Sequence, residues 1–369
     1  MKKLLFFLFF IPFVSFSQTS FTNANITAAV DLWVSDQVLA EYLYGNISNW
    51  DVSGVTDMSY LFSGFDTFNS DINSWDVSNV TDMSYLCYNA DHFNSDIGDW
   101  DVSNVTDMQR MFSNNTWDSS VNLDISNWDV GNVTNMQMMF SGALAFNQDI
   151  GDWNVSNVTN MEMMFFNALA FNQDIGDWDV SNVTNMNRMF LNNGYVSTAS
   201  FNQDIGDWDV SNVTNTSEMF KYATAFNQDI GDWNVSNITN LSGMFSNAWA
   251  FNQDIGDWDV SNVISMAGMF STSGLSSENY DNLLLGWSEL EDLQYGVGFD
   301  CSTTYCQGFS AKIILVTTHG WIISDSGYLC DGCTNPIACN YDSLATTDDG
   351  SCAYPTSSTT TVTECDSYD

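Results

Sequence analysis

Apolar residues recur along most of this 369-residue chain at a fixed spacing, with polar residues between them. Nine tryptophans mark the phase, and neighbours in the series are 25 residues apart except across two gaps of 28 and 30. The longer gaps hold insertions near residues 114–120 and 193–200, which we predict to be surface loops because they leave the period undisturbed. The nine are Trp50, Trp75, Trp100, Trp128, Trp153, Trp178, Trp208, Trp233 and Trp258.

One repeat, taken around Trp153, illustrates the elements that this pattern predicts. Trp153 and Val155 have the period-two spacing of a short strand, and Ser156 and Asn157 then favour a turn. The four apolar residues that begin at Met161 follow the i, i+3, i+4, i+7 spacing of one helix face. Each unit is therefore expected to run strand, turn, short helix, loop. The apolar positions of this unit are Phe146, Ile150, Trp153, Val155, Val158, Met161, Met164, Phe165 and Ala168.

Such a unit has too little apolar surface to fold alone, so its inward residues must be covered by the units before and after it. We therefore predict an α/β repeat solenoid of nine coils over residues 42–270, with an N-terminal cap at 18–41 and a C-terminal cap at 271–329. The tryptophans would stack as core columns, represented by Trp153, Trp178, Trp208, Trp233 and Trp258.

The start of the chain predicts export. Lys2 and Lys3 precede an apolar run from Leu4 to Phe16 that is shorter than the roughly 20 residues needed to span a bilayer, and small residues follow it. We interpret residues 1–17 as a cleaved signal peptide. The protein is then expected to be secreted or at the cell surface, with no membrane insertion.

The charge balance narrows the range of partners. The chain has 46 Asp and Glu against 6 Lys and Arg, a formal net charge of -40. Nucleic acid is excluded as a natural partner because phosphate binding needs clustered basic residues. Solubility and cation binding both remain as explanations of the acidity.

The acidic residues recur at three positions in each unit. One column directly precedes the Ile of the unit, as Asp149 does, and we expect its carboxylates to accept turn N–H groups. The other two columns flank the Trp and should point outward, where they form a hypothetical ligand face. Its candidates are Asp99, Asp101, Asp152, Asp177, Asp179, Asp207, Asp209, Asp232, Asp257 and Asp259.

Eight cysteines add constraints near the C-terminus. Residues 330–355 form a small Cys-rich module, for which disulfides fit an exported chain better than zinc, and residues 356–369 look like a Ser/Thr linker and the start of a truncated further module. Cys87 replaces the Phe of other units and is expected to be a buried free thiol. The disulfide candidates are Cys301, Cys306, Cys330, Cys333, Cys339 and Cys352, with local pairing of the first two and Cys365 left over.

Two resemblances bear on the fold and the function. The order Ile-x-x-Trp-x-Val followed by Val-Thr-x-Met-x-x-Met-Phe-x-x-Ala resembles BspA-like leucine-rich-repeat surface proteins, and "WDVSNVTNMxxMF" resembles a 25-residue Mycoplasma lipoprotein-associated repeat. These likenesses imply a leucine-rich-repeat-like, right-handed stack and a role as a surface adhesin or interaction scaffold.

The Cys-rich module also carries a resemblance. Its "TxDDGSC" turn is similar to small modules of secreted Bacteroidetes proteins, which implies a calcium site at Asp342, Asp348 and Asp349. Calcium is the one candidate cofactor.

Catalysis is not expected from this sequence. The two histidines, His92 and His319, stand in no constellation with a nucleophile, and the carboxylates recur identically, whereas a catalytic pair needs two unlike environments. The leading hypothesis is a non-catalytic scaffold for adhesion or for recognition of an extracellular protein or polysaccharide. The alternative is a calcium-stabilised structural spacer within a longer surface protein.

Overall fold

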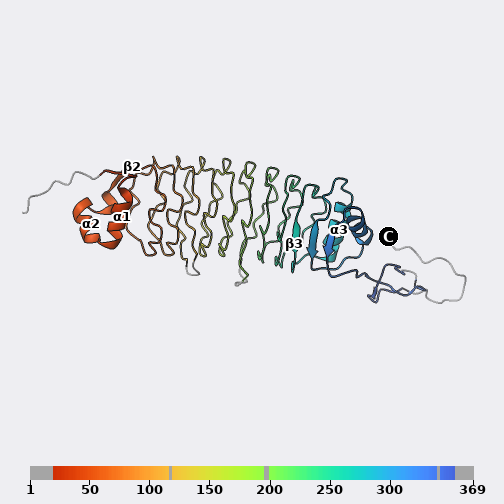
Figure 1. Cartoon of the computed structure of the whole chain (residues 1–369). Helices are drawn as coiled ribbons and strands as arrows, with labels where there is room; N and C mark the ends of the chain where they lie inside the picture. The colour runs from red at the N-terminus through yellow and green to blue at the C-terminus, as the bar shows by residue number, and fades with distance from the viewer. Residues whose placement is uncertain (1–19, 116–118, 195–198, 339–340, 354–369) are drawn as a thin grey trace, which may run out of the picture.

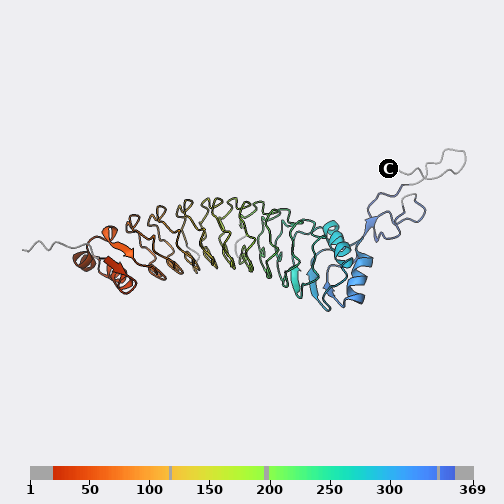
Figure 2. The same cartoon turned by 90° about the horizontal axis from the view of Figure 1, so that it is seen from above.

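The computed structural model describes residues 20–115, 119–194, 199–338 and 341–353, so the expected signal peptide and the segment 356–369 lie outside the described residues. Parts of both predicted insertion loops, and Cys339 and Cys365, also lie outside them. The units lie side by side along an elongated molecule, with helices at both ends (Figure 1). In the view from above the array follows a shallow arc (Figure 2).

Neighbouring units are joined by parallel backbone pairing at one short segment. Each unit contributes one bridge residue, such as Asn160, which pairs with Asn185 of the next unit. The N–H groups of Met161, Met163 and Phe165 then donate to carbonyl oxygens of the next unit at 2.9 to 3.1 Å. The bridge residues are Asp57, Asp82, Asp107, Asn135, Asn160, Asn185, Asn215, Asn240 and Ser265.

The short helix expected from Met161 onward is not formed, which corrects the helix of the predicted unit. The described residues between 55 and 265 contain turns and single bridges but no helix. An α-helix needs its N–H groups for its own i−4 carbonyls, whereas alternate N–H groups here bond to the next unit. Consecutive i→i+3 turns fill the gaps, and Met163 takes a φ of 55° within the first of them. These turns bury Met161, Met164 and Phe165 all the same.

The strand expected at Trp153 and Val155 is also absent. The Trp153 N–H closes a turn onto the Ile150 carbonyl at 3.2 Å, and the Val158 N–H closes another onto the Val155 carbonyl at 2.8 Å. The alternation still holds, because Trp153 and Val155 are buried while Asp152 and Asn154 are exposed. The apolar spacing correctly predicted which side chains face inward, but it did not predict which backbone hydrogen bonds form.

Aromatic side chains stack in columns through the core. The Trp208 and Trp233 rings lie 6.5 Å apart and within 4° of parallel, and Trp258 continues the stack at 6.5 Å. From Trp75 onward each indole N–H of the nine also bonds to the unit before it, as that of Trp178 does to the Ile150 carbonyl at 3.0 Å. Each such Trp therefore fills the core and also bonds to the turn of the preceding unit, so it helps to fix the spacing between the two units.

The N-terminal end is closed by helices. α1 (Ile26–Ser35) and α2 (Gln37–Tyr44) follow β1 (Ser20–Thr22), and the short 3-10 helix η1 (Ile47–Asn49) leads into β2 (Asp51–Gly54), which pairs parallel with β1. Trp33 of α1 packs edge-on against Trp50 at 5.9 Å, so α1 covers the first ring of the column.

The C-terminal end is a three-stranded parallel sheet with two helices. β3 (Met266–Phe270), β4 (Gly298–Cys301) and β5 (Ile322–Ser324) pair in that order, with α3 (Ser277–Ser288) and α4 (Phe309–Thr318) in the connections. The indole N–H of Trp287 donates to the Ile255 carbonyl of the last repeat unit at 3.3 Å, so this Trp continues the bonding pattern of the repeat tryptophans.

The Cys-rich module carries β6 (Asp331–Gly332) paired with β7 (Thr347–Asp348) and two disulfides. Cys306 bonds to Cys330 and Cys333 bonds to Cys352. The local pair predicted between Cys301 and Cys306 is therefore wrong. Cys301 belongs to β4, where it is buried as a free thiol, while Cys306 lies beyond that strand. Cys87 is a buried free thiol, as expected.

Candidate recognition surfaces

The aspartates that precede the Ile of each unit are occupied by their own turns. Asp149 accepts the Gly151 N–H at 3.1 Å, and Asp174 accepts the Gly176 N–H at 3.0 Å. The prediction for this column is confirmed: these carboxylates build the turn that leads into the Trp segment. The same bond forms at Asp71, Asp96, Asp124, Asp149, Asp174, Asp204, Asp229 and Asp254.

The aspartates that follow the Trp are exposed but also act as turn caps. Asp179 accepts both the N–H and the hydroxyl of Ser181, at 3.1 and 2.6 Å. Asn154 accepts the same two donors of Ser156, so the turn needs the oxygen and not the charge. The hydroxyl and N–H of the serine two residues on hold the pKa of Asp101 below its ordinary value, and the same cause lowers the pKa of Asp209. Of the predicted ligand face, Asp101, Asp179, Asp209 and Asp259 belong to this column.

The aspartates that precede the Trp are the ones left open to solvent. Asp99 accepts the side-chain amide of Asn73 at 3.0 Å. The other five are exposed and make no hydrogen bond or ion pair with another described residue. We call these the open acidic row: Asp152, Asp177, Asp207, Asp232 and Asp257.

The three aspartates proposed for calcium do not form a common site. Asp342, Asp348 and Asp349 each accept a backbone N–H two residues further on, at 2.8 to 2.9 Å. Across the described ranges of the chain, no group of three or more His, Cys, Asp or Glu side chains is placed to hold a metal ion.

A second surface, half-buried in most units, follows the paired backbone segment and was not predicted from the sequence. One residue per unit has a positive φ between 54° and 68° in the first of the consecutive turns. Its side chain is buried in none of the units where the residue is other than glycine. We call this the left-handed row: Tyr60, Tyr85, Arg110, Met138, Met163, Arg188, Glu218, Gly243 and Gly268.

The left-handed row is one of two adjacent positions at which otherwise near-identical units differ. It is the second variable letter of "VTNMxxMF", between two core methionines that recur in most units. That variation is visible in the sequence and could have identified the row as a candidate binding surface. It was missed because helical spacing assigned these positions to the outer face of a helix.

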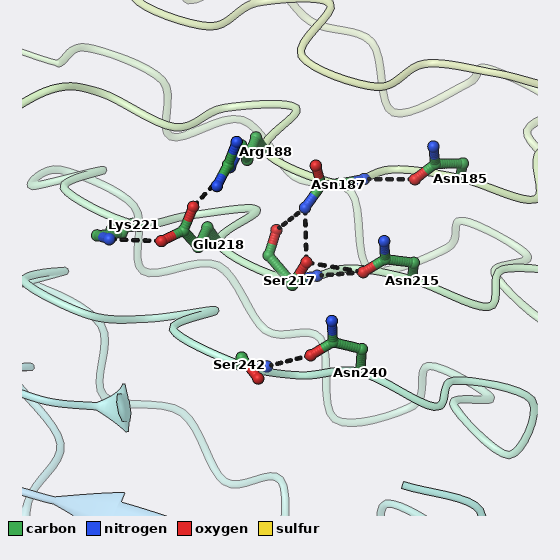
Figure 3. A network of polar contacts seen from close by, with 9 residues as sticks. All are labelled: Asn185, Asn187, Arg188, Asn215, Ser217, Glu218, Lys221, Asn240 and Ser242. Carbon is green, nitrogen blue, oxygen red and sulfur yellow. Dashed lines mark hydrogen bonds and ion pairs between the residues drawn. The ribbon is translucent and has the colours of Figure 1, made fainter. Parts of the chain in front are cut away.

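A polar network connects this surface across several units (Figure 3). Asn187 donates to the carbonyl and the hydroxyl of Ser217 in the next unit, at 2.8 and 2.5 Å. Asn185 and Asn215 accept the N–H groups of the residues two positions on, at 3.1 and 3.0 Å. The bridge residues therefore orient the variable side chains that follow them.

Glu218 is the centre of the charged part of this network (Figure 3). Its carboxylate lies 2.6 Å from the Arg188 Nε and 2.5 Å from the Lys221 Nζ. Burial raises the pKa of Glu218, but hydrogen bonds from Lys221 and Arg188 outweigh burial and leave the pKa below its ordinary value. A depression of about 340 Å³ adjoins the three side chains, where the row changes to Gly243 and Gly268.

The other end of the left-handed row is aromatic. The Tyr60 and Tyr85 rings stack at 4.4 Å and 12°, and the Arg110 guanidinium lies 5.5 Å from the centre of the Tyr85 ring. Tyr88 packs edge-on against Tyr85 at 5.5 Å. Tyr60 is 53% exposed, so this cluster offers a ring to solvent.

No helix within the described residues is both long enough and apolar enough to cross a membrane. No curated protein matches the chain. No solved structure matches it.

A family model described as "Mycoplasma protein of unknown function" matches three times in tandem, over residues 34–117, 117–195 and 191–283. The resemblance to a Mycoplasma-type repeat is thus confirmed, while the likeness to BspA-like leucine-rich repeats stays a prediction. Because the three matches together cover residues 34 to 283, the chain belongs to the DUF285 repeat family.

Proposed function

We propose that this protein is a secreted or cell-surface, non-catalytic scaffold that recognises an extracellular protein or polysaccharide. The stacked units would act as a leucine-rich-repeat-like solenoid in which turns replace the helix. The binding face in this proposal is the left-handed row and not the predicted ligand face beside the Trp column.

The observation that carries the proposal is where variation is tolerated. Most positions on the acidic side repeat because they cap turns or bond between units, so folding explains them. The open acidic row has no such role, but it holds the same residue in each of its units. The left-handed row differs from unit to unit although a positive φ favours Gly or Asn there. A scaffold that reads a partner needs such a row of different side chains on a constant frame.

Export is supported by the two disulfides. Cys306–Cys330 and Cys333–Cys352 staple the Cys-rich module to the C-terminal cap and within itself. Structural disulfides persist in oxidising compartments and are rare in the cytosol.

The test is binding of the mature chain to a panel of purified extracellular matrix proteins and neutral polysaccharides at 150 mM salt. A row variant, Met138→Asn/Met163→Asn/Arg188→Asn, is compared with an acidic variant, Asp177→Asn/Asp207→Asn/Asp232→Asn. We expect the row variant to bind at least ten-fold more weakly and the acidic variant to bind within two-fold of the parent. Loss in the acidic variant alone would contradict the assignment of the face, and a parent that binds no member of the panel would contradict recognition as the function.

A further inference from the structure

The aromatic end of the left-handed row holds bulky side chains where the backbone disfavours them. Tyr60, Tyr85 and Arg110 have φ values of 60°, 58° and 54°. A left-handed conformation is unfavourable for an ordinary L-residue, because its Cβ comes too close to the following carbonyl oxygen. Glycine would remove that strain, and the chain uses it at Gly243 and Gly268 in the same row.

The second left-handed position of the unit provides an internal comparison. It lies four residues further on, and mostly has the residues that the conformation favours, as in Gly64, Asn89, Gly142, Asn167 and Asn247. The chain therefore follows backbone preference at one position and departs from it at the other. Strain retained along one row whose side chains are at least partly open to solvent indicates that these side chains are used.

The chemistry of this row matches a protein partner better than a glycan. From Tyr60 to Arg188 it reads Tyr, Tyr, Arg, Met, Met, Arg. Tyr, Met and Arg are the residues enriched at the centres of protein–protein interfaces, and Tyr and Arg dominate hot spots.

Charge narrows the partner further. The bridge residues beside the aromatic end are Asp57, Asp82 and Asp107, and the whole chain has a formal net charge of -40. An approaching basic segment would be steered toward this surface, whereas an acidic one would be repelled. Tyr85 already has a cation over its ring in Arg110, at 5.5 Å. Tyr60 has no second ring neighbour among the described residues and is 53% exposed, so it can accept a cation in the same way.

We propose that Tyr60, Tyr85 and Arg110 form a docking site for a basic segment of a protein partner, whose Arg or Lys side chain stacks on the Tyr60 ring. This inference rests on the proposed function and names the class of partner at one end of the row.

The experiment uses the mature full chain and three fluorescein-labelled peptides, (Gly-Ser-Arg)5, (Gly-Ser-Gln)5 and (Gly-Ser-Glu)5, with a neutral glucose hexasaccharide as a further ligand. Peptide binding is followed by anisotropy at 150 mM salt, and hexasaccharide binding by calorimetry. The test variant is Tyr60→Asn/Tyr85→Asn. The matched control is Tyr222→Asn, which removes a tyrosine from a left-handed residue at the second position, with a φ of 59°. Thermal melts of both variants check that the array is folded.

We expect that, of the three peptides, only the Arg peptide binds the parent. It should bind the double variant at least five-fold more weakly than the parent, and its affinity for Tyr222→Asn should be within two-fold of that for the parent. Equal binding of the Arg peptide to all three proteins would overturn the inference, because it would reduce to general attraction by the acidic surface. Binding of the hexasaccharide that is lost in the double variant, or no peptide binding to the parent, would also overturn it. Neither result touches the proposed function, whose test uses Met138, Met163 and Arg188 and an unbiased panel.

Discussion

Replacing Asp207 with Asn should stabilise the protein, because it removes an unpaired charge from the middle of the open acidic row. Asp207 lies between Asp177 and Asp232 of the neighbouring units, and none of the three has a partner among the described residues. Trp208 and Trp233 directly follow Asp207 and Asp232, and their indole rings are 6.5 Å apart, so we take about 6 Å as the distance between the carboxylates of neighbouring units. At that distance each pair repels by about 0.7 kcal/mol in water.

Salt sets the size of the effect that is measured. With a Debye length of about 8 Å at 0.15 M, the two repulsions together fall to about 0.7 kcal/mol, whereas at 0.01 M they remain near 1.1 kcal/mol. Asp207→Asn should therefore raise the free energy of unfolding by these amounts. The assay is urea unfolding followed by tryptophan fluorescence, at both salt concentrations and with a chelator present.

Asp209→Asn is the matched control. It removes one charge two residues away, but its column has an aspartate on one side, Asp179, and Asn234 on the other. The turn cap survives because asparagine makes the same bond in that column at Asn154. We expect less than half the stabilisation, because the lowered pKa of Asp209 means that its charge strengthens the bonds from Ser211, and asparagine loses that contribution.

The electrostatic reasoning would be refuted if Asp207→Asn lowers the free energy of unfolding, or if it raises that free energy by the same amount at both salt concentrations. A calcium series at fixed ionic strength, with magnesium as the control, tests the alternative role as a spacer. If calcium raises the melting temperature of the parent but not of Asp207→Asn, the open acidic row binds cations and the spacer hypothesis gains.

Three further predictions concern the frame and the network. Trp178→Phe should cost roughly 1–3 kcal/mol, because it removes one of the two hydrogen bonds of the buried Ile150 carbonyl and leaves a cavity, and a loss under 0.5 kcal/mol by urea unfolding would mean that the indole bond contributes nothing. Gly142→Ala should cost several kcal/mol of stability, since its Cβ would lie 2.0 Å from a backbone oxygen. Gly243→Ala should cost about 1 kcal/mol, since its Cβ would meet a flexible side chain at 3.2 Å. Equal urea-unfolding midpoints for the two variants would contradict this. The lowered pKa of Glu218 means that its ion pairs stabilise the fold above its ordinary pKa near 4.5, and that this contribution disappears as the pH falls through the lower folded value. The difference in unfolding free energy between the parent and Glu218→Gln should therefore be constant above about pH 6 and shrink toward about pH 3. A difference independent of pH would refute this prediction.

The candidate site was predictable only in part. Spacing placed the Trp-flanking aspartates outward, and all ten candidates are exposed. What spacing did not separate was a carboxylate that caps a turn, such as Asp179, from one with no partner, such as Asp177. That difference depends on whether the residue two positions on turns its N–H back, which is a property of the folded backbone.

The period, the inward and outward side chains, and the family to which the repeat belongs could all be predicted from the amino-acid sequence. These follow from burial, because an apolar residue repeated at each unit must be covered by the next one. The tertiary structure alone decided where the backbone bonds go. Once the N–H of Met161 and the N–H of Met163 bond to the neighbouring unit, a helix is impossible, and turns with a positive φ take its place. The same contact with the next unit creates the left-handed row. Beyond the repeats, the pairing of Tyr305 with Tyr328 brings Cys306 to Cys330 and not to Cys301. Spacing along the chain cannot encode such pairings, because they join residues that become neighbours only when the units stack.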